Sequence, residues 1–314
     1  MSIMKAVLCT KYGGPEVLKL GHIKKPQPKK DEVLIKIYAS SVTRSDLFVR
    51  GFGITFPQIV FLRLAMGIFK PRNPVLGQTF AGIIEETGSG ITRFKKEDRV
   101  VGFGGFSFGG YAEYKCMKET DSKRGCLAVI PENISFEDAV SAAYGGLLAF
   151  QFMDTGNIKC GDKVLIYGAS GTSGVIAVQY AKYLGATVTA VCGPANLEFV
   201  KSLGADKALD YTKAESVSEL EEYDFILDAV GKAKTSALKI AAKKALTGSG
   251  IYASIDDSAL LLDSVRLGRI IDLVAKDAIK PVTDRAYPIE EIVEAHRYVE
   301  KDHKRGNIAV IINA

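Results

Sequence analysis

Short runs of apolar residues, separated by glycine, proline and aspartate, predict a β-rich segment at the start of the chain. Strand-like runs lie at 6–10, 33–39, 99–103 and 111–115. Runs of this length between turn-forming residues are typical of strands. The run 307–313 near the other end has the same character. We therefore expect a mostly β domain built from both ends of the chain.

After about Leu127 the apolar runs become strands that alternate with helical spacing. The run 163–168 predicts a buried strand, and apolar residues within 175–185 recur at helical intervals until Gly185. This alternation predicts a doubly wound parallel sheet, so the fold class is α/β. The later expected elements are a strand at 187–192, a helix at 196–204, and strands at 224–231 and 250–255.

Two domains follow from this change of pattern. The β-rich domain takes residues 1–127 and 281–314, and the α/β domain takes residues 128–280. A further helix is expected from Ala259 onward, capped by the segment Asp256-Asp257-Ser258.

A glycine-rich segment, 168–174, connects the strand at 163–167 to the following helix. Its spacing is GxxGxxG rather than GxGxxG. Glycines let the backbone approach a pyrophosphate closely, and the N–H groups at a helix start stabilise its charge. An ordinary glycine-rich turn is the alternative. The residues predicted to bind a dinucleotide here are Gly168, Ser170, Gly171, Thr172, Ser173 and Gly174.

The residues that would contact the adenosine ribose favour NADPH over NADH. An acid about 20 positions after the first glycine would bind the 2′-hydroxyl of NAD, and the window 188–194 contains none. A carboxylate there would repel a 2′-phosphate, so NADPH is permitted and NADH remains the alternative. Cys192, Gly193, Asn196 and Tyr211 are the expected contacts at this end of the cofactor.

Composition excludes several other classes of protein. The 41 Lys and Arg exceed the 36 Asp and Glu by only five and form no basic cluster, which argues against nucleic-acid binding. The five cysteines form no CxxC pair. The apolar stretch 54–69 contains Pro57 and Arg63 and is too short for stable membrane insertion. With no signal peptide at the start, these features indicate a cytoplasmic protein.

Several separated segments resemble the medium-chain dehydrogenase/reductase superfamily, specifically its zinc-independent quinone oxidoreductase branch. They are KAVLCTKYGGPEVLKL, GQTFAGIIEETGSGITRFKKEDRVVGF, IYGASGTSGVIAVQYAK, NLEFVKSLGADKALDYT, DFILDAVG and AYPIEEIVEAHRYVEKDHKRGNIAVII. The resemblance implies a GroES-like β domain, a Rossmann domain and an active-site cleft between them. It also implies NADPH-dependent reduction of quinones or α,β-unsaturated carbonyl compounds.

The resemblance also identifies where zinc-dependent relatives place their metal ligands. Those positions contain Thr43, Gln78 and Tyr144 here, which are poor zinc ligands. His296 and His303 do not cluster with acids or cysteines, and their segment predicts a solvated helix and its end. We therefore expect no metal.

Without a Lewis acid, a conjugated acceptor is easier to reduce than a simple alcohol is to oxidise, because hydrogen-bond donors can stabilise the developing oxyanion. Tyr144 is the leading candidate donor, with Thr43, Ser45 and Gln78 as alternatives. Asp46 is expected to be structural and to hold its loop. The resemblance places Val230 and Gly231 beside the nicotinamide ribose, and Gly306 and Asn307 in a segment that closes onto the cofactor.

Some alternatives remain open. The apolar segment 51–71 could be a lid, a core helix or a helix that touches a membrane surface. The protein could reduce double bonds or aldehydes without acting on quinones, or could bind NADPH without catalysis. The family's usual edge strand after Ile255 is shortened, so a homodimer is in doubt and a monomer or a different pairing is expected.

Overall fold

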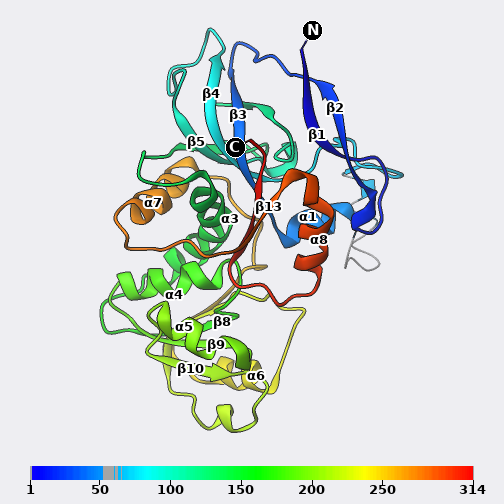
Figure 1. Cartoon of the computed structure of the whole chain (residues 1–314). Helices are drawn as coiled ribbons and strands as arrows, with labels where there is room; N and C mark the ends of the chain where they lie inside the picture. The colour runs from blue at the N-terminus through cyan, green and yellow to red at the C-terminus, as the bar shows by residue number, and fades with distance from the viewer. Residues whose placement is uncertain (1, 52–59, 61–62, 65, 314) are drawn as a thin grey trace. The chain divides into compact units, whose positions relative to one another are not determined.

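The computed structural model describes residues 2–51, 60, 63–64 and 66–313. The chain forms two compact units, and many of their elements are labelled in Figure 1. The division at Ala143 and Tyr144 lies inside a helix, α3 (Phe136–Met153), whereas the sequence placed the boundary after Leu127. The first unit contains residues 1–143, 262–271 and 283–314, and the second contains residues 144–261 and 272–282.

The second unit is built on a parallel sheet with the strand order β10-β9-β8-β11-β12. From β8 the chain moves through β9 and β10, then returns to the other side of β8 for β11 and β12. This reversal makes the carboxyl ends of β8 and β11 a topological switch point, where ligands of such sheets bind. The strands are β8 (Lys163–Tyr167), β9 (Thr187–Cys192), β10 (Lys207–Asp210), β11 (Tyr223–Asp228) and β12 (Leu246–Ser254).

Helices connect these strands as the sequence pattern predicts. Helix α4 (Gly174–Tyr183) follows the glycine segment directly, and its residues from Gly174 to Ala181 are all buried. Gly185 follows it with a φ of +87°, a backbone conformation that ends helices readily. The other α-helical parts of this unit are α5 (Leu197–Ser202), α6 (Ala237–Lys244), the part of α3 after Ala143 and the end of α7 (Ser264–Ala275) from Asp272 onward.

The first unit contains a mostly antiparallel sheet. Among the described residues its strand order is β13-β14-β3-β4-β5-β7, with β6 also pairing with β3, and β1 pairs separately with β2. Alternating apolar residues of β3 enter a core that also includes Phe80 and Tyr111. The strands are β1 (Ile3–Cys9), β2 (Leu18–Lys24), β3 (Glu32–Val42), β4 (Thr79–Thr87), β5 (Arg99–Phe103), β6 (Tyr114–Lys118), β7 (Cys126–Val129), β13 (Thr283–Pro288) and β14 (Asn307–Ile311).

Residues from both ends of the chain complete this unit, as expected. Strand β14 lies between β13 and β3, pairing parallel with the first and antiparallel with the second. Helix α1 (Arg44–Arg50) contacts α8 (Ile292–Glu300), which follows β13. Helix α7 (Ser264–Ala275) contributes residues 264–271 to the same unit.

Three local predictions were wrong. The strand expected at 111–115 lies at β6, three residues later, and Ala112 makes only an isolated bridge with Ala6. No helix begins at Ala259; α7 begins at Ser264, where the Asp263 carboxylate accepts hydrogen bonds from the next turn. His296 is not solvated: it faces the core from α8 and is fully buried.

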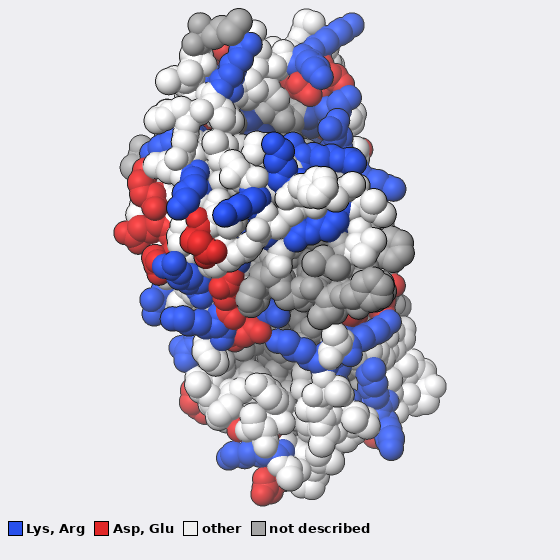
Figure 2. Space-filling model, turned by 90° about the vertical axis from the view of Figure 1, so that its right-hand side faces the viewer, with Lys and Arg blue, Asp and Glu red and all other residues white. Residues whose placement is uncertain are grey.

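Charged side chains are mixed over the face drawn in Figure 2, where Asp and Glu side chains lie among those of Lys and Arg. This distribution agrees with the small formal net charge of +5. None of the helices among the described residues has the length and apolar character required to span a bilayer. Most of the apolar segment 51–71, with its three possible roles, lies outside the described residues.

Candidate functional site

The glycine segment forms a tight loop between β8 and α4. Gly168 has a φ of +83°, and a Cβ atom there would lie 2.4 Å from Val230 Cγ2. At Gly174 a Cβ would lie 2.2 Å from the Gly168 carbonyl oxygen, so only glycine fits without moving the backbone. At Gly171, by contrast, a Cβ would meet only that same oxygen, at 3.4 Å. The loop is therefore closed by its first and third glycines and open at the second.

This open position is where a pyrophosphate would approach. The N–H of Val175, the second residue of α4, already donates to the Gly171 carbonyl at 3.1 Å, and the N–H of Gly171 donates to the Gly168 carbonyl at 3.0 Å. The positive end of the α4 dipole stabilises negative charge there. Ser173 is buried at the end of the loop, and Ser170 Oγ accepts a hydrogen bond of 3.3 Å from Asn196 Nδ2. The loop fits the diphosphate of a dinucleotide.

The predicted adenosine contacts gather at the carboxyl ends of β9 and β10. Cys192 is buried at the end of β9, and its carbonyl accepts the N–H of Tyr211. A Cβ on Gly193 would lie 3.6 Å from the Tyr211 ring. Sequence analysis missed Asp210, a buried acid paired in register with Cys192, whose Oδ1 accepts the backbone and hydroxyl hydrogens of Thr212.

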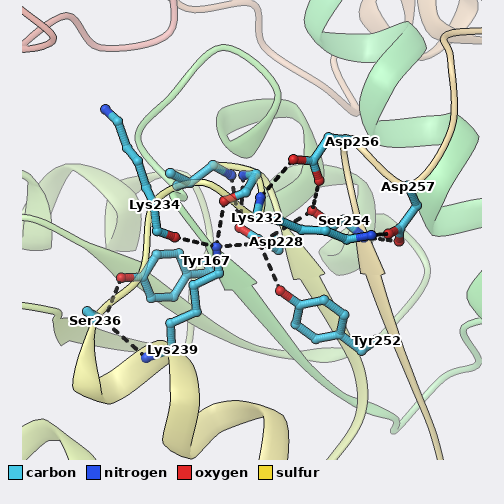
Figure 3. Close-up of polar contacts among 12 residues, drawn as sticks. Tyr167, Asp228, Lys232, Lys234, Ser236, Lys239, Tyr252, Ser254, Asp256 and Asp257 are labelled. Carbon is cyan, nitrogen blue, oxygen red and sulfur yellow. Dashed lines mark hydrogen bonds and ion pairs between the residues drawn. The ribbon is translucent and has the colours of Figure 1, made fainter. Parts of the chain in front are cut away.

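At the end of β11 the structure shows a buried polar network that sequence analysis did not identify. Asp228 Oδ1 accepts hydrogen bonds of 3.1 Å from the N–H groups of Val230 and Gly231, the two predicted nicotinamide contacts. Its Oδ2 lies 2.5 Å from Lys239 Nζ and accepts a 2.8 Å bond from the Tyr252 hydroxyl. Figure 3 shows these groups converging on Asp228.

A second layer of this network comes from the end of β12. Ser254 Oγ donates to Asp256 Oδ1, and Asp256 Oδ2 accepts the backbone N–H of Lys232 (Figure 3). Asp257 accepts the N–H of Ser254 and pairs with the Lys232 amine at 2.5 Å. The two acids that were predicted to cap a helix therefore fix the loop after β11 instead. Lys232 holds the pKa of the Asp257 carboxyl below its ordinary value by hydrogen bonding.

Tyr144 lies in the second unit, on α3. Its neighbour Gly145 packs against the glycine loop, because a Cβ on Gly145 would lie 2.2 Å from the carbonyl oxygen of Thr172. This contact places α3 directly beside the loop predicted to bind pyrophosphate. Tyr144 itself is partly exposed.

The other candidate donors, Thr43, Ser45 and Gln78, belong to the first unit. Thr43 caps α1: its hydroxyl accepts the N–H of Asp46, and its own N–H and hydroxyl donate to Asp46 Oδ2 at 2.9 and 2.7 Å. Asp46 is therefore structural, as predicted. Ser45 is half-buried on α1, and Gln78 Nε2 donates to the Gly105 carbonyl.

Asp46 is fully buried, and this burial raises the pKa of its carboxyl to about 6, against the opposing effect of the Thr43 hydrogen bonds. The predicted cofactor residue Asn307 also belongs to the first unit, where its Nδ2 donates to the Ser141 carbonyl at 2.7 Å. Gly306, beside it, has a φ of +60°. The predicted cleft between the domains, to which these residues would contribute, stays a prediction.

The donor set does not fit a zinc ion. Thr43 and Gln78 present only neutral groups, of which the Thr43 hydroxyl donates to Asp46 and Gln78 Nε2 donates to Gly105, and zinc binds thiolate, imidazole or carboxylate. Within the part of the chain that the structure describes, no three His, Cys, Asp or Glu side chains gather as a metal-binding group.

Comparison with known proteins gives a consistent result. Residues 29–127 match the family model "Alcohol dehydrogenase GroES-like domain", and residues 203–310 match "Zinc-binding dehydrogenase". The chain is 30% identical to an NADPH-dependent alkenal/one oxidoreductase of Arabidopsis thaliana, over 98% of this chain and 79% of the relative. It is 26% identical to the human quinone oxidoreductase, over 95% of this chain and 94% of the relative.

A solved structure of similar fold is the quinone oxidoreductase from Coxiella burnetii. Its TM-score is 0.82 at 26% sequence identity, and the match covers 99% of this chain and all of that one. The GroES-like and Rossmann-type expectations from sequence are thereby confirmed.

Proposed function

The chain belongs to the medium-chain dehydrogenase/reductase superfamily, in its quinone oxidoreductase branch, and from this premise we propose that it uses NADPH to reduce quinones or α,β-unsaturated carbonyl compounds. It is an oxidoreductase. The observation that carries the proposal is the glycine loop 168–174, which is closed at Gly168 and Gly174 and open at Gly171.

NADPH, when bound, would supply a hydride. The loop and the start of α4 would hold its diphosphate, and the ends of β9 and β10 would hold its adenosine through Cys192, Gly193, Asn196 and Tyr211. Val230 and Gly231, whose N–H groups Asp228 accepts, would position the nicotinamide ribose. Asn307 stays a predicted contact of the cofactor. Preference for NADPH over NADH rests on the lack of an acid in 188–194.

The protein's part in the chemistry is to stabilise an oxyanion and deliver a proton. Addition of hydride to the β-carbon of a conjugated carbonyl compound places negative charge on the carbonyl oxygen. A phenol can donate a hydrogen bond to such an oxygen, and Tyr144 is the residue we propose for that role, with Thr43, Ser45 and Gln78 as alternatives. No step passes through a metal, because the residues at the family's metal positions do not fit one.

The first experiment is a binding titration paired with a substrate panel. We expect NADPH to bind more tightly than NADH and to be oxidised by quinones and 2-alkenals, with little turnover of saturated aldehydes. Gly171→Ala leaves the protein's own contacts ordinary and so should reduce NADPH affinity about tenfold without loss of fold, because its methyl group enters the pyrophosphate space. Gly248→Ala, where a Cβ meets nothing within 4 Å, is the control.

The outcomes separate the alternatives. Turnover of alkenals without turnover of quinones would indicate the double-bond reductase. Tight NADPH binding without any turnover would indicate a non-catalytic binding module. Failure to bind either coenzyme would contradict the proposal altogether. All five cysteines are unpaired, which suits the reducing cytoplasm that we propose as its location.

A further inference from the structure

Two lysines are buried in the part of the chain that the structure describes, and they differ in their surroundings. Lys115, in the first unit, is hydrogen-bonded to the Phe108 carbonyl and to Ser107, both neutral groups. Lys239, in the second unit, forms a 2.5 Å ion pair with Asp228, with side-chain exposures of 4% and 0%. Removing two charges from water costs several kcal/mol per ion, and a well-packed neutral pair is often at least as stable. Stability alone therefore does not account for the pair.

The contacts of the pair show what it organises. Lys239 Nζ donates to the carbonyl oxygens of Gly231 and Lys234, both at 2.7 Å. Asp228 accepts the N–H of the same Gly231. The pair thus holds Gly231 by both of its backbone polar groups, which belong to the two peptide units on either side of its Cα atom. Figure 3 shows the ion pair between Lys239 and Asp228.

Gly231 needs such support because its backbone is unusual. Its φ is +92°, and a Cβ there would lie 3.0 Å from Asp256 Oδ2. Its neighbour Val230 packs against Gly168, the first glycine of the pyrophosphate loop. Movement of the segment 229–232 would therefore change the wall of the cofactor site where β8 and β11 adjoin.

We propose that Lys239 is a positioning residue for the nicotinamide half of the cofactor, acting through its buried ion pair with Asp228 to hold the Val230–Gly231 segment in its binding conformation. The inference rests on the proposed function. It assigns no contact between Lys239 and the cofactor. A loop already held in place loses little conformational entropy when the ligand binds. The Lys239–Asp228 pair should therefore favour binding of the nicotinamide half of the cofactor and leave binding of the adenosine half unaffected.

The test removes both charges together. Lys239→Met alone would leave Asp228 charged and buried without a partner, which is strongly destabilising. The double variant Asp228→Asn/Lys239→Met avoids this, and Asn can still accept the N–H groups of Val230 and Gly231. Lys244→Met, at an exposed position of the same helix, is the matched control.

Two ligands report on the two halves of the site. NADPH occupies both halves, and adenosine 2′,5′-bisphosphate occupies only the adenosine half. For the double variant we expect NADPH affinity to fall about tenfold and KM for NADPH to rise by a similar factor. Adenosine bisphosphate affinity should stay within about twofold of wild type, and KM for the carbonyl substrate should change little. The control should match wild type throughout.

Equal losses for both ligands, or no loss for either, would overturn the inference, because a merely structural pair would weaken the whole unit. A wild-type protein that binds neither ligand would instead sink the proposed function, so the two failures are distinguishable. Should the double variant not fold, Tyr252→Phe decides the same comparison. It removes only the 2.8 Å hydrogen bond to Asp228, and we expect a loss of about threefold for NADPH alone.

Discussion

Tyr144 is the residue on which the proposed chemistry most depends, since it lies beside Gly145, which packs on the glycine loop. Tyr144→Phe keeps the ring and removes the hydroxyl. We expect kcat for alkenal reduction to fall about a hundredfold, as when other oxyanion donors are lost, with NADPH affinity unchanged. Stopped-flow measurement of NADPH oxidation checks this. Tyr183→Phe, on the exposed side of α4, should behave as wild type, and an unchanged kcat in Tyr144→Phe would assign the role to another donor.

His296 gives the first unit a pH-dependent stability. Burial, aided by Arg50, lowers the pKa of its imidazole from 6.5 to about 3. Between these values the unfolded chain binds a proton that the folded chain does not. The contribution of the neutral His296 imidazole to stability is therefore complete above pH 6.5 and is lost as pH falls. Between pH 7 and pH 5 we expect His296 alone to lower the free energy of unfolding by about 2 kcal/mol.

His296→Phe should remove that loss, since a phenyl ring fits the edge contact with Tyr111 without titrating. Urea unfolding at the two pH values measures it. His22→Phe, at an exposed position of β2, should keep the wild-type difference. Asp46 acts in the opposite sense, because its folded pKa of about 6 lies above the ordinary 3.8. The contribution of Asp46 to stability is greatest below pH 3.8 and falls as pH rises to 6. It is the same in the wild type and in His296→Phe.

Helix α1 depends on one reciprocal cap. Thr43 accepts the N–H of Asp46, and the Asp46 carboxylate accepts the N–H and hydroxyl of Thr43. Thr43→Ala removes the hydroxyl from both exchanges and should cost about 1–2 kcal/mol in the free energy of unfolding. Thr43→Ser retains the hydroxyl and should cost much less. If urea unfolding gave equal losses for the two variants, the hydroxyl would not be the stabilising group.

Elements with strong local signals could be predicted from sequence. β8, the glycine loop and α4 were identified because an apolar run, glycines and helical spacing follow one another along 163–185. The helix expected at Ala259 was wrong because Asp256 and Asp257 bond to Ser254 and Lys232 rather than to a helix start. The contacts with Lys232 depend on the pairing of β11 with β12, which no local pattern records.

The same limit applies to the candidate site. Glycines and small polar residues of the pyrophosphate loop carry a spacing that sequence can show. Asp228 and Lys239 have no such spacing. Asp228 ends β11 and Lys239 lies on the following helix, α6, so only the fold brings their charged groups to 2.5 Å. An acid at a strand end followed by a lysine on the buried face of the next helix is the signal that could have found them.

The whole molecule has a sheet edge that bears on assembly. Among the described residues β12 is the outer strand of the second unit, and the chain continues to α7 without another strand. We expect no dimer through this edge. Ile251→Lys places a charge on β12 and should leave the mass from light scattering unchanged. A dimer in the wild type that dissociates in this variant would show that the edge is used after all.

Strand β14, between β13 and β3, has a consequence for biosynthesis. On the ribosome β3 emerges long before Asn307–Ile311. The β3 residues that pair with β14 therefore have no partner strand there until the intervening residues have been translated. The parallel sheet can assemble during that interval, since its strands are nearly contiguous in the chain. The second unit should therefore complete its sheet first, and the first unit should be the part that stays incomplete longer during synthesis.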